Sequence, residues 1–327
     1  MTTPTTAPTT LRLSLLDQSP IPAGGTPADA LAATLGLART ADRLGYHRYW
    51  VAEHHGSPSF AGTAPEILVA TLLGHTRRLR VGTGGVLLPR YAPAKVAEVF
   101  RVLAALHPGR VDLGVGRAGG PAHRFPEQVA ELLRRLTDPA QAYQGYTAPP
   151  VWLLGAGTRS AELAAELGTR FAFAHFFNPG LGIGALDAFR AGPTGSDRTR
   201  SALAVRAIVA DTEAEATELG TAYLLWRSRK DLGFDEPFPD RARTRAHRWT
   251  GDESDRAGHN ARAVLTGTPE RIRARLDELA RAHGVDEIVV NTLTHDPADR
   301  VRSYELLAEA FGRTAVDAPA PVLQGVV

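Results

Sequence analysis

Residues 79–105 read LRVGTGGVLLPRYAPAKVAEVFRVLAA, in which a short apolar run precedes an alanine- and valine-rich stretch of helical length. The pattern predicts a strand over Leu79–Leu88 and a helix over Ala92–Ala105. Such continuous apolar runs are typical of parallel strands that are buried on both faces of a sheet. The number of times this strand–helix unit recurs along the chain therefore decides the fold.

The unit recurs along almost the whole chain. The predicted strands are Leu11–Leu16, His47–Ala52, Leu79–Leu88, Val111–Val115, Val151–Leu154, Phe171–Ala174, Ala202–Ala210 and Glu287–Leu293. The predicted helices are Pro27–Leu44, Ala64–Thr76, Ala92–Ala105, Pro126–Leu136, Ser160–Leu167, Gly184–Phe189, Thr212–Arg229, Pro269–His283 and Ala298–Phe311. This alternation predicts an α/β fold, a (β/α)8 TIM barrel with its active site at the carboxyl ends of the strands. An open doubly wound sheet is the alternative.

The composition excludes several classes of protein. The 327 residues include no cysteine, which excludes disulfides, a thiol nucleophile and a cysteine-based zinc site. The net charge of +2 comes from intermixed acids and arginines, without the contiguous basic stripe that nucleic acids require. Apolar runs are too short for a membrane span, and the N-terminus lacks the pattern of a signal peptide. We therefore expect a cytoplasmic protein that binds neither nucleic acid nor membrane.

We expect a single barrel domain over residues 11–315, with a disordered leader over 1–10 and a flexible C-terminal tail over 316–327. One segment interrupts the alternation: Asp231–Asn260 is polar and rich in proline, glycine, aspartate and arginine. A loop of this length inside a compact domain is usually functional or disordered. Because it follows the seventh helix, we predict that it forms a lid over the barrel mouth.

The first chemical motif is Glu53-His54-His55, directly after a predicted strand. Because side chains alternate between the two faces of a strand, the histidines point in opposite directions and are poor joint metal ligands, so we predict no metal site. A histidine that faces the barrel interior, with a pKa near neutral, suits a general base or proton shuttle. A structural histidine bonded to a carboxylate such as Glu53 is the alternative.

Two glycine-rich segments also follow predicted strands. Gly84 and Gly85 would allow a flat ligand to approach closely, and a β-bulge is the alternative. The glycines of Asp112–Gly120 spell G-x-G-x-x-G, but no helix follows, as the dinucleotide motif requires. Arg117 in that segment is better interpreted as a ligand for phosphate.

A predicted anion site opens the helix that begins at Ser160. Gly157, Thr158 and Ser160 lie at its start, where free backbone N–H groups and the helix dipole favour an anion. Arg117 follows the preceding strand and could share the same phosphate, and a plain helix cap is the alternative. After the sixth strand, His175 would be the polar tip of an apolar pocket, unless that segment is ordinary core packing.

Taken in this order, these segments resemble the bacterial-luciferase-like flavin monooxygenases, from Leu13 to Phe311. The marks of the resemblance are Leu16-Asp17-Gln18-Ser19-Pro20, Ala52-Glu53-His54-His55, Val81–Pro89, Gly109-Arg110 with Gly114–Gly120, Ser160–Ala165, Gly267–Glu270 and Ser303–Ala308. The chain looks most like the branch of tailoring enzymes from bacterial polyketide antibiotic clusters. Where the luciferases have a reactive cysteine this chain has Gly116, and it has Ala156 where they have an acid, which argues against light emission.

The resemblance implies that reduced FMN lies across the barrel mouth. Arg117 and Gly157–Ser160 would hold its phosphate, and Gly84-Gly85 would form a cis peptide against its ring. His54 matches a histidine that serves as a base near the flavin, and His175 is the second catalytic candidate.

The implied activity is that of a two-component monooxygenase. A separate NAD(P)H flavin reductase would supply reduced FMN, and one oxygen atom of O2 would enter an organic substrate. Four phenylalanines favour an apolar or aromatic substrate, with ordinary core packing as the alternative: Phe60, Phe125, Phe176 and Phe177. An F420-dependent oxidoreductase of the same fold and a non-catalytic flavin-binding protein are the alternatives. The resemblance also implies a homodimer formed through the helices beside strands two to four.

Overall fold

The computed structural model describes residues 11–118, 120, 123–141, 146–193 and 197–314, so the expected leader and tail lie outside the described residues. The strands are β1 (Arg12–Asp17), β2 (Arg48–Val51), β3 (Arg80–Thr83), β4 (Val86–Leu87), β5 (Val111–Gly116), β6 (Val151–Gly155), β7 (Arg170–Ala174), β8 (Ser201–Val209), β9 (Val264–Gly267) and β10 (Glu287–Asn291). The helices are α1 (Pro27–Arg43), α2 (Pro65–His75), α3 (Pro93–Leu106), α4 (Phe125–Thr137), α5 (Thr158–Glu166), α6 (Gly182–Ala191), α7 (Glu213–Asp231), α8 (Arg241–Ala246), α9 (Gly251–Asn260), α10 (Pro269–His283) and α11 (Pro297–Ala310).

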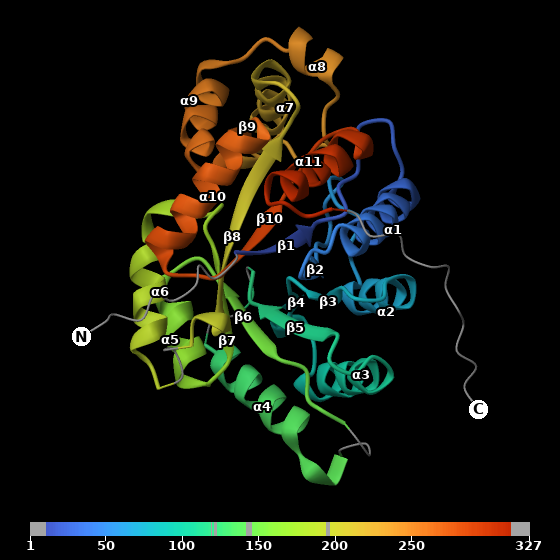
Figure 1. Cartoon of the computed structure of the whole chain (residues 1–327), viewed down its shortest axis with the longest axis vertical. Coiled ribbons are helices and arrows are strands. Elements are labelled where there is room, and N and C mark those ends of the chain that lie inside the picture. Colours follow the sequence, from blue (N-terminus) through green and yellow to red (C-terminus); the bar gives the residue numbers. More distant parts are fainter. Residues whose placement is uncertain (1–10, 119, 121–122, 142–145, 194–196, 315–327) are drawn as a thin grey trace.

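The strands close into a barrel. Parallel pairing runs in the order β10-β1-β2-β3-β5-β6-β7-β8, and pairing of β8 with β10 completes the ring. The helices lie around this ring of strands (Figure 1). These observations confirm the predicted TIM barrel and exclude the open doubly wound sheet.

The alternation of side chains along the strands produces two apolar layers. The larger layer, which we call the outer layer, packs outward-facing side chains such as Leu13 and Leu15 of β1 against the helices. The smaller layer, which we call the inner plug, fills the barrel interior: Leu16, Trp50, Ala52, Trp152, Ala172, Phe176, Ala202, Ala204 and Val289. The inner plug separates the two ends of the barrel from each other.

The predicted strand Leu79–Leu88 is interrupted in the middle. Gly82 pairs with Asp112 and Val86 pairs with Val115, so four residues advance along one strand while three advance along the other. This mismatch is a β-bulge. The peptide bond between Gly84 and Gly85, inside the bulge, is cis. The alternative of a bulge and the cis peptide implied by the resemblance are therefore both present.

The expectation of an irregular loop over Asp231–Asn260 is wrong. The segment forms α8 and α9, and α9 packs against α7. Each of the two helices begins at a side-chain cap: Asp240 accepts from the backbone of Arg243, and Thr250 forms a capping box with Glu253. Such caps satisfy the free N–H groups of a first turn, so a polar sequence can still be helical.

The prediction also missed β9. Its four residues, VLTG, form too short an apolar run to stand out, and they pair with Arg206–Val209 in the second half of β8. β9 therefore pairs alongside β8 but is not one of the eight strands of the closed ring. Within the described ranges, no helix is long and apolar enough to cross a membrane, and no three potential metal ligands gather at one point.

Candidate active site

The candidate active site lies where β1, β2 and β8 approach the carboxyl end of the barrel. Arg206 of β8 donates from Nη2 to Gln18 Oε1 at 3.2 Å, and the amide nitrogen of Gln18 lies 3.1 Å from His54 Nε2. The imidazole of His54 packs against the ring of Phe60, with centroids 4.3 Å apart. A side-chain relay thus crosses the barrel mouth from Arg206 to His54, at the end where barrel enzymes place their catalytic groups.

The relay determines which nitrogen of His54 carries the proton. A guanidinium only donates, so the oxygen of Gln18 faces Arg206 and its amide nitrogen faces His54. The amide nitrogen also only donates, so Nε2 of His54 accepts and the neutral ring carries its proton on Nδ1. Nδ1 is buried and has no hydrogen-bond partner among the described residues. His54 therefore keeps one unused N–H donor.

The surroundings of His54 disfavour its charged form. Burial, followed by the positive charge of Lys230 on α7, lowers its pKa from 6.5 to about 4. The expected pKa near neutral is therefore wrong, because the sequence does not reveal the burial of the ring or the nearby cation. At pH 7 the ring is neutral, so it is a hydrogen-bond donor and a weak base.

Arg206 is the main residue of this site that the sequence analysis missed. Its side chain is buried, and among the described residues its guanidinium donates only to neutral groups: Gln18, the Asn291 side chain at 2.9 Å and the Tyr223 hydroxyl. The ring of Phe176 lies 4.8 Å from the guanidinium carbon. Alternation along β8, where Ala202, Ala204 and Arg206 share a face, was the signal that could have placed it inside the barrel.

The charge of Arg206 has no carboxylate partner. Among the described residues, no carboxylate oxygen lies within 4.0 Å of its guanidinium. The buried residues Arg48 and Arg300, by contrast, contact Asp112 and Asp17 at 2.6 and 2.9 Å. A buried charge is costly unless it is paired, so Arg206 makes this end of the barrel attractive to an anionic group.

His55 turns away from His54, as strand alternation predicts. Its Nε2 lies 2.5 Å from the buried carboxylate of Glu53, which also accepts from the backbone of Leu87 and the hydroxyl of Tyr91. The structural alternative for this motif therefore applies to His55. These contacts tie the chain after β2 to β4 and hold the neighbouring His54 in place.

Gly84 and Gly85 lie beside the inner plug. A Cβ at Gly84 would come within 2.6 Å of a methyl group of Leu16, and one at Gly85 within 2.7 Å of the backbone of Gly114. The packing of the barrel itself therefore requires glycine at position 85, whereas a side chain at position 84 would displace the end of Leu16. Their contact with a flat ligand stays a prediction.

The start of α5 has the features of an anion site. Gly157 precedes the helix without a side-chain cap, and a Cβ there would meet no atom within 4 Å. Thr158 is exposed, and Ser160 packs against Gly155. An uncapped first turn with open space beside it leaves backbone N–H groups available to an anion.

Arg117 follows β5, the strand that pairs with β6, so it emerges at the same end of the barrel as the start of α5. Its side chain is exposed, and its guanidinium donates to the carbonyl of Gly120 at 3.1 Å. Among the described residues, no hydrogen bond joins it to Gly157–Ser160. The two predicted phosphate ligands are thus neighbours in the fold without direct contact.

His175 does not join His54. It follows Phe171 and Phe173, which belong to the outer layer, and its ring lies 5.5 Å from that of His283 on α10. Burial, and then the charge of His283, lower its pKa to about 4. Its catalytic role stays a prediction, and its contacts are those of packing between a strand and a helix.

The four phenylalanines of the substrate prediction separate in the fold. Phe60 and Phe176 lie beside the relay, whereas Phe125 is buried in the outer layer and Phe177 is 63% exposed. Phe177 nevertheless packs against Phe176, with ring centroids 4.7 Å apart.

The segment between α7 and α8 folds onto the loops of the barrel mouth. Phe238 donates its backbone N–H to Ile21 and accepts from that of Ala23, in the loop after β1. Ser59, in the loop after β2, donates to Asp235 at 2.8 Å. The segment therefore lies at the carboxyl end, and its opening and closing as a lid stay a prediction.

Comparison with known proteins places this geometry in context. The model of a family described as luciferase-like monooxygenase matches residues 11–287. The N-acetyl-S-alkylcysteine monooxygenase of Bacillus subtilis strain 168 is 35% identical, over 92% of this chain and 98% of its own. The crystal structure of apo-MsnO8 is 37% identical with a TM-score of 0.83, covering 94% of this chain and 100% of its own. The fold is also similar to that of the oxygenating constituent of 3,6-diketocamphane monooxygenase from the CAM plasmid of Pseudomonas putida, which was solved in complex with FMN. That structure has a TM-score of 0.68 at 20% identity and covers 92% of this chain and 97% of its own.

Proposed function

The chain belongs to the luciferase-like monooxygenase family, and from this premise we propose that it binds reduced FMN at the barrel mouth and transfers one oxygen atom of O2 to an organic substrate. The observation that carries the cofactor proposal is the uncapped start of α5 beside the strand that leads to Arg117. Backbone N–H groups and a guanidinium together are a common set of donors to phosphate. The unpartnered Nδ1 of His54 and the charge of Arg206 would complete a site for the polar ring of the cofactor.

Reduced FMN, when bound, would supply the two electrons that activate O2 for transfer of one of its oxygen atoms. The residues of the chain would bind the cofactor, orient it and shield it from water. His54 would donate its Nδ1 proton as a neutral group, held in that tautomer by Gln18. Arg206 would stabilise negative charge near the relay, and the rings of Phe60 and Phe176 would exclude water from it.

We further propose that a separate NAD(P)H-dependent reductase supplies the reduced flavin. The similar diketocamphane protein is named as an oxygenating constituent, which supports such a division of labour. The segment between α7 and α8 would cover the mouth after the flavin enters, because it already contacts the loops after β1 and β2.

The proposed substrate is an apolar or aromatic molecule of secondary metabolism. Phe60 and Phe176 support an apolar surface beside the relay. The similar Bacillus subtilis protein is named for an N-acetylated S-alkylcysteine, so a thioether belongs in the set of candidates. Membership of this family makes the chain an oxidoreductase rather than a non-catalytic flavin-binding protein, and an F420-dependent oxidoreductase of the same fold is the competing function.

The test of oxygen transfer uses isotopic oxygen. The protein, FMN, NADH and a flavin reductase are incubated under 18O2 with a panel of thioethers and aromatic compounds. The proposal predicts a product that carries one 18O atom, at a rate at least tenfold lower in His54→Ala than in the wild-type protein. A product without label, or none from the whole panel, contradicts the proposed reaction.

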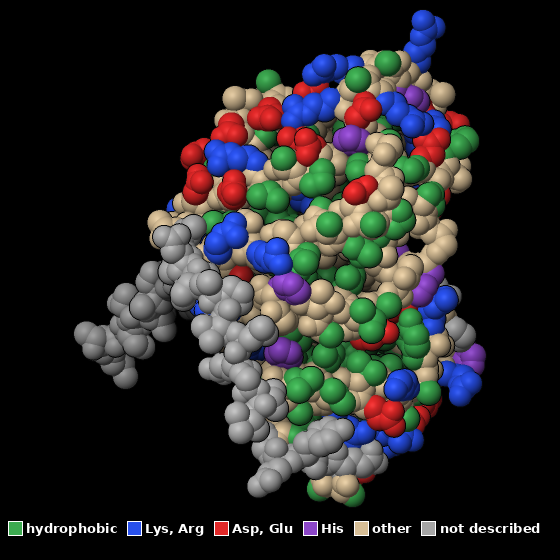
Figure 2. Space-filling model, turned by 90° about the vertical axis from the view of Figure 1, so that its right-hand side faces the viewer, with side chains coloured by type: hydrophobic (Ala, Val, Ile, Leu, Met, Phe, Trp, Pro, Cys, Tyr) green, Lys and Arg blue, Asp and Glu red, His purple; other side chains and the backbone are tan. Residues whose placement is uncertain are grey.

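We also propose a homodimer through α2 and α3. Three large apolar side chains on these helices are exposed: Ile67 at 63%, Val102 at 44% and Leu106 at 67%. Figure 2 shows the side of the molecule that carries α1, α2 and α3, with hydrophobic side chains gathered over its middle and lower parts and charged ones toward its top. Contiguous exposed apolar surface is typical of an interface, and a second copy of the chain fits it.

A further inference from the structure

A cavity lies at the amino-terminal end of the barrel, opposite the proposed cofactor site. It has a volume of about 520 Å³, and its lining includes Arg12, His47, Arg48, Arg80 and Arg170. This volume falls within the range of about 300–1,000 Å³ that is usual for small-molecule sites. The amino-terminal end of a TIM barrel ordinarily serves stability alone, so a cavity with this lining calls for an explanation.

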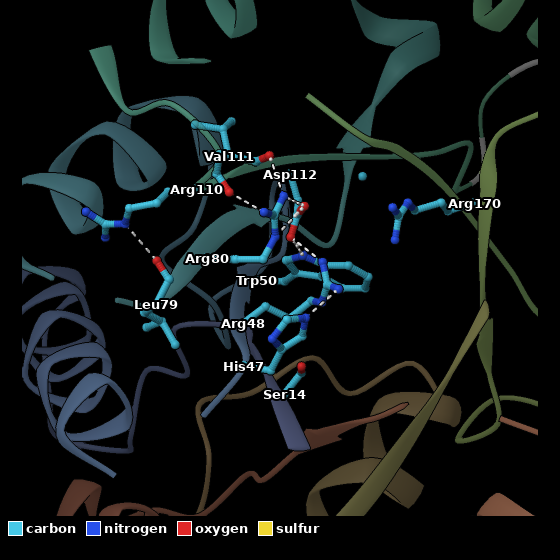
Figure 3. Close-up of polar contacts among 12 residues, drawn as sticks. Ser14, His47, Arg48, Trp50, Leu79, Arg80, Arg110, Val111, Asp112 and Arg170 are labelled. Carbon is cyan, nitrogen blue, oxygen red and sulfur yellow. Dashed lines mark hydrogen bonds and ion pairs between the residues drawn. The ribbon is translucent and has the colours of Figure 1, made fainter. Parts of the chain in front are cut away.

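The arginines reach the cavity because of their positions in the strands. Arg12, Arg48, Arg80 and Arg170 are the first residues of β1, β2, β3 and β7. Each is followed two residues later by a side chain or glycine that points into the barrel, so strand alternation directs all four inward. Figure 3 shows Arg48 and Arg80 converging on Asp112, with Arg170 extending toward them from the other side.

The carboxylates in this region compensate only part of the charge. Asp112 contacts Arg48 and Arg80, each at 2.6 Å, and Glu287 contacts Arg48 at 2.5 Å. Four guanidinium groups therefore face two buried carboxylates.

Arg12 and Arg170 are the two cations that remain uncompensated. Among the described residues, no carboxylate oxygen lies within 4.0 Å of either, and the polar contact of Arg170 is the carbonyl of Thr199. Two other acids of this region already have partners: Asp197 accepts from the backbone and hydroxyl of Thr199, and Asp286 pairs with Arg198 at 2.7 Å. Two positive charges therefore have room to bind an anion.

Burial and the charge of Arg48 lower the pKa values of two groups that line the cavity. Burial, followed by the charge of Arg48, lowers the pKa of His47 to about 4. Burial and the charge of Arg48 also lower the pKa of Arg170. His47 accepts a hydrogen bond from Arg48 at 3.0 Å, so it is neutral and adds no charge of its own.

The cavity is distinct from the barrel mouth. The inner plug lies between the cavity and the mouth. The edge-to-face pair of Trp50 and Trp152, with centroids 5.1 Å apart, forms the side of the plug that faces the arginines. Arg48 lies over Trp152 at 4.8 Å and Arg170 lies over the same ring at 5.4 Å. A ligand bound among the arginines would therefore not touch the relay of Gln18 and His54.

We propose that this cavity is a binding site for a small phosphorylated metabolite, whose phosphate groups pair with Arg12 and Arg170. Guanidinium groups match phosphate oxygens through paired hydrogen bonds, and two uncompensated cations suit a doubly charged group. A ligand that binds the folded barrel here stabilises it against unfolding. The proposal does not depend on the cofactor or on the reaction at the mouth.

The test is titration calorimetry with inorganic pyrophosphate as the probe, supported by thermal unfolding. The variants are Arg12→Gln and Arg170→Gln, which leave no buried carboxylate without a partner. Arg117→Gln reports binding at the mouth, and Arg302→Gln on the exposed face of α11 is the matched surface control.

The expected result is binding at the cavity that is at least tenfold weaker in Arg12→Gln and in Arg170→Gln and unchanged in Arg302→Gln, while Arg117→Gln removes only the binding at the mouth. Pyrophosphate should also raise the unfolding temperature of the wild-type protein and of Arg117→Gln, but much less in Arg12→Gln. The proposal is overturned if the wild-type protein does not bind millimolar pyrophosphate, if Arg117→Gln abolishes binding, or if both cavity variants bind normally.

Discussion

The protonation state of His54 depends on its contact with Gln18. Replacement Gln18→Leu removes the donor to Nε2 and the acceptor for Arg206. We predict that His54 then populates both neutral tautomers, whereas wild-type His54 is protonated on Nδ1 alone. Nitrogen-15 chemical shifts of the imidazole at pH 7 measure this directly. A wild-type spectrum with the proton on Nε2 would refute the assignment.

At the residue scale, the sequence predicted the direction of the two histidine side chains correctly but not the pKa of His54. Strand alternation separated His54 from His55, and the contacts with Gln18 and Glu53 agree with it. The low pKa of His54 could not be predicted, because it arises from burial and from Lys230, 176 positions away. Arg206 was within reach of the alternation argument but lay in no recognised motif.

The bulge between β3 and β4 depends on glycine. A methyl group at Gly85 would lie 2.7 Å from the backbone of Gly114, which cannot yield without moving β5. We predict that Gly85→Ala lowers the free energy of unfolding by about 1–3 kcal/mol, as overpacked sites do. Gly116→Ala, with no atom within 4 Å of the added methyl, is the control and should be neutral. Equal stability of the two variants in urea would contradict this account.

At the scale of elements, both errors of prediction arose because apolar periodicity was the only signal used to assign helices and strands. The segment Asp231–Asn260, which contains α8 and α9, was predicted as a loop because polar residues dominate it, although Thr250 and Glu253 form a capping box. β9 was missed because two apolar residues in four carry too little signal, and its pairing with β8 supplies the rest. A capping box stabilises the start of α9, and pairing with β8 stabilises β9. Neither feature changes the spacing of apolar residues along the chain.

The pH dependence of stability follows from three histidines with a pKa of about 4: His47, His54 and His175. Between pH 4 and 6.5 the unfolded chain binds more protons than the folded protein, so stability falls as the pH is lowered through this window. We predict uptake of about three protons on unfolding near pH 5, and about two in His47→Gln. Urea unfolding at several pH values measures the slope. A flat profile would contradict the prediction.

The proposed dimer makes a prediction for the whole molecule. Leu106→Glu places a charge in the exposed apolar surface of α3 and should convert a dimer into monomers in sedimentation velocity. Ile183→Glu, on α6 across the barrel and 49% exposed, is the control and should keep the wild-type mass. A monomeric wild-type protein, or a dimer that survives Leu106→Glu, would contradict the proposed interface.

The barrel itself could be predicted because eight buried strands repeat one local pattern, and closure follows from their number. The amino-terminal cavity could not, since its arginines are distant in sequence and meet only when β1, β2, β3 and β7 form one ring. The sequence alone likewise could not show which charges are compensated.

The central claim is that the barrel mouth holds reduced FMN through its phosphate. Anaerobic fluorescence titration of the protein with reduced FMN, reduced riboflavin and reduced F420 tests it most directly. The account predicts that reduced FMN binds most tightly, and that Arg117→Ala loses about 1.5–3 kcal/mol of its binding free energy, roughly 10- to 150-fold in Kd, as for a charged hydrogen bond. The affinity for riboflavin, which lacks the phosphate, should not change in that variant. Tighter binding of F420, or an unchanged affinity of Arg117→Ala for reduced FMN, would contradict the claim.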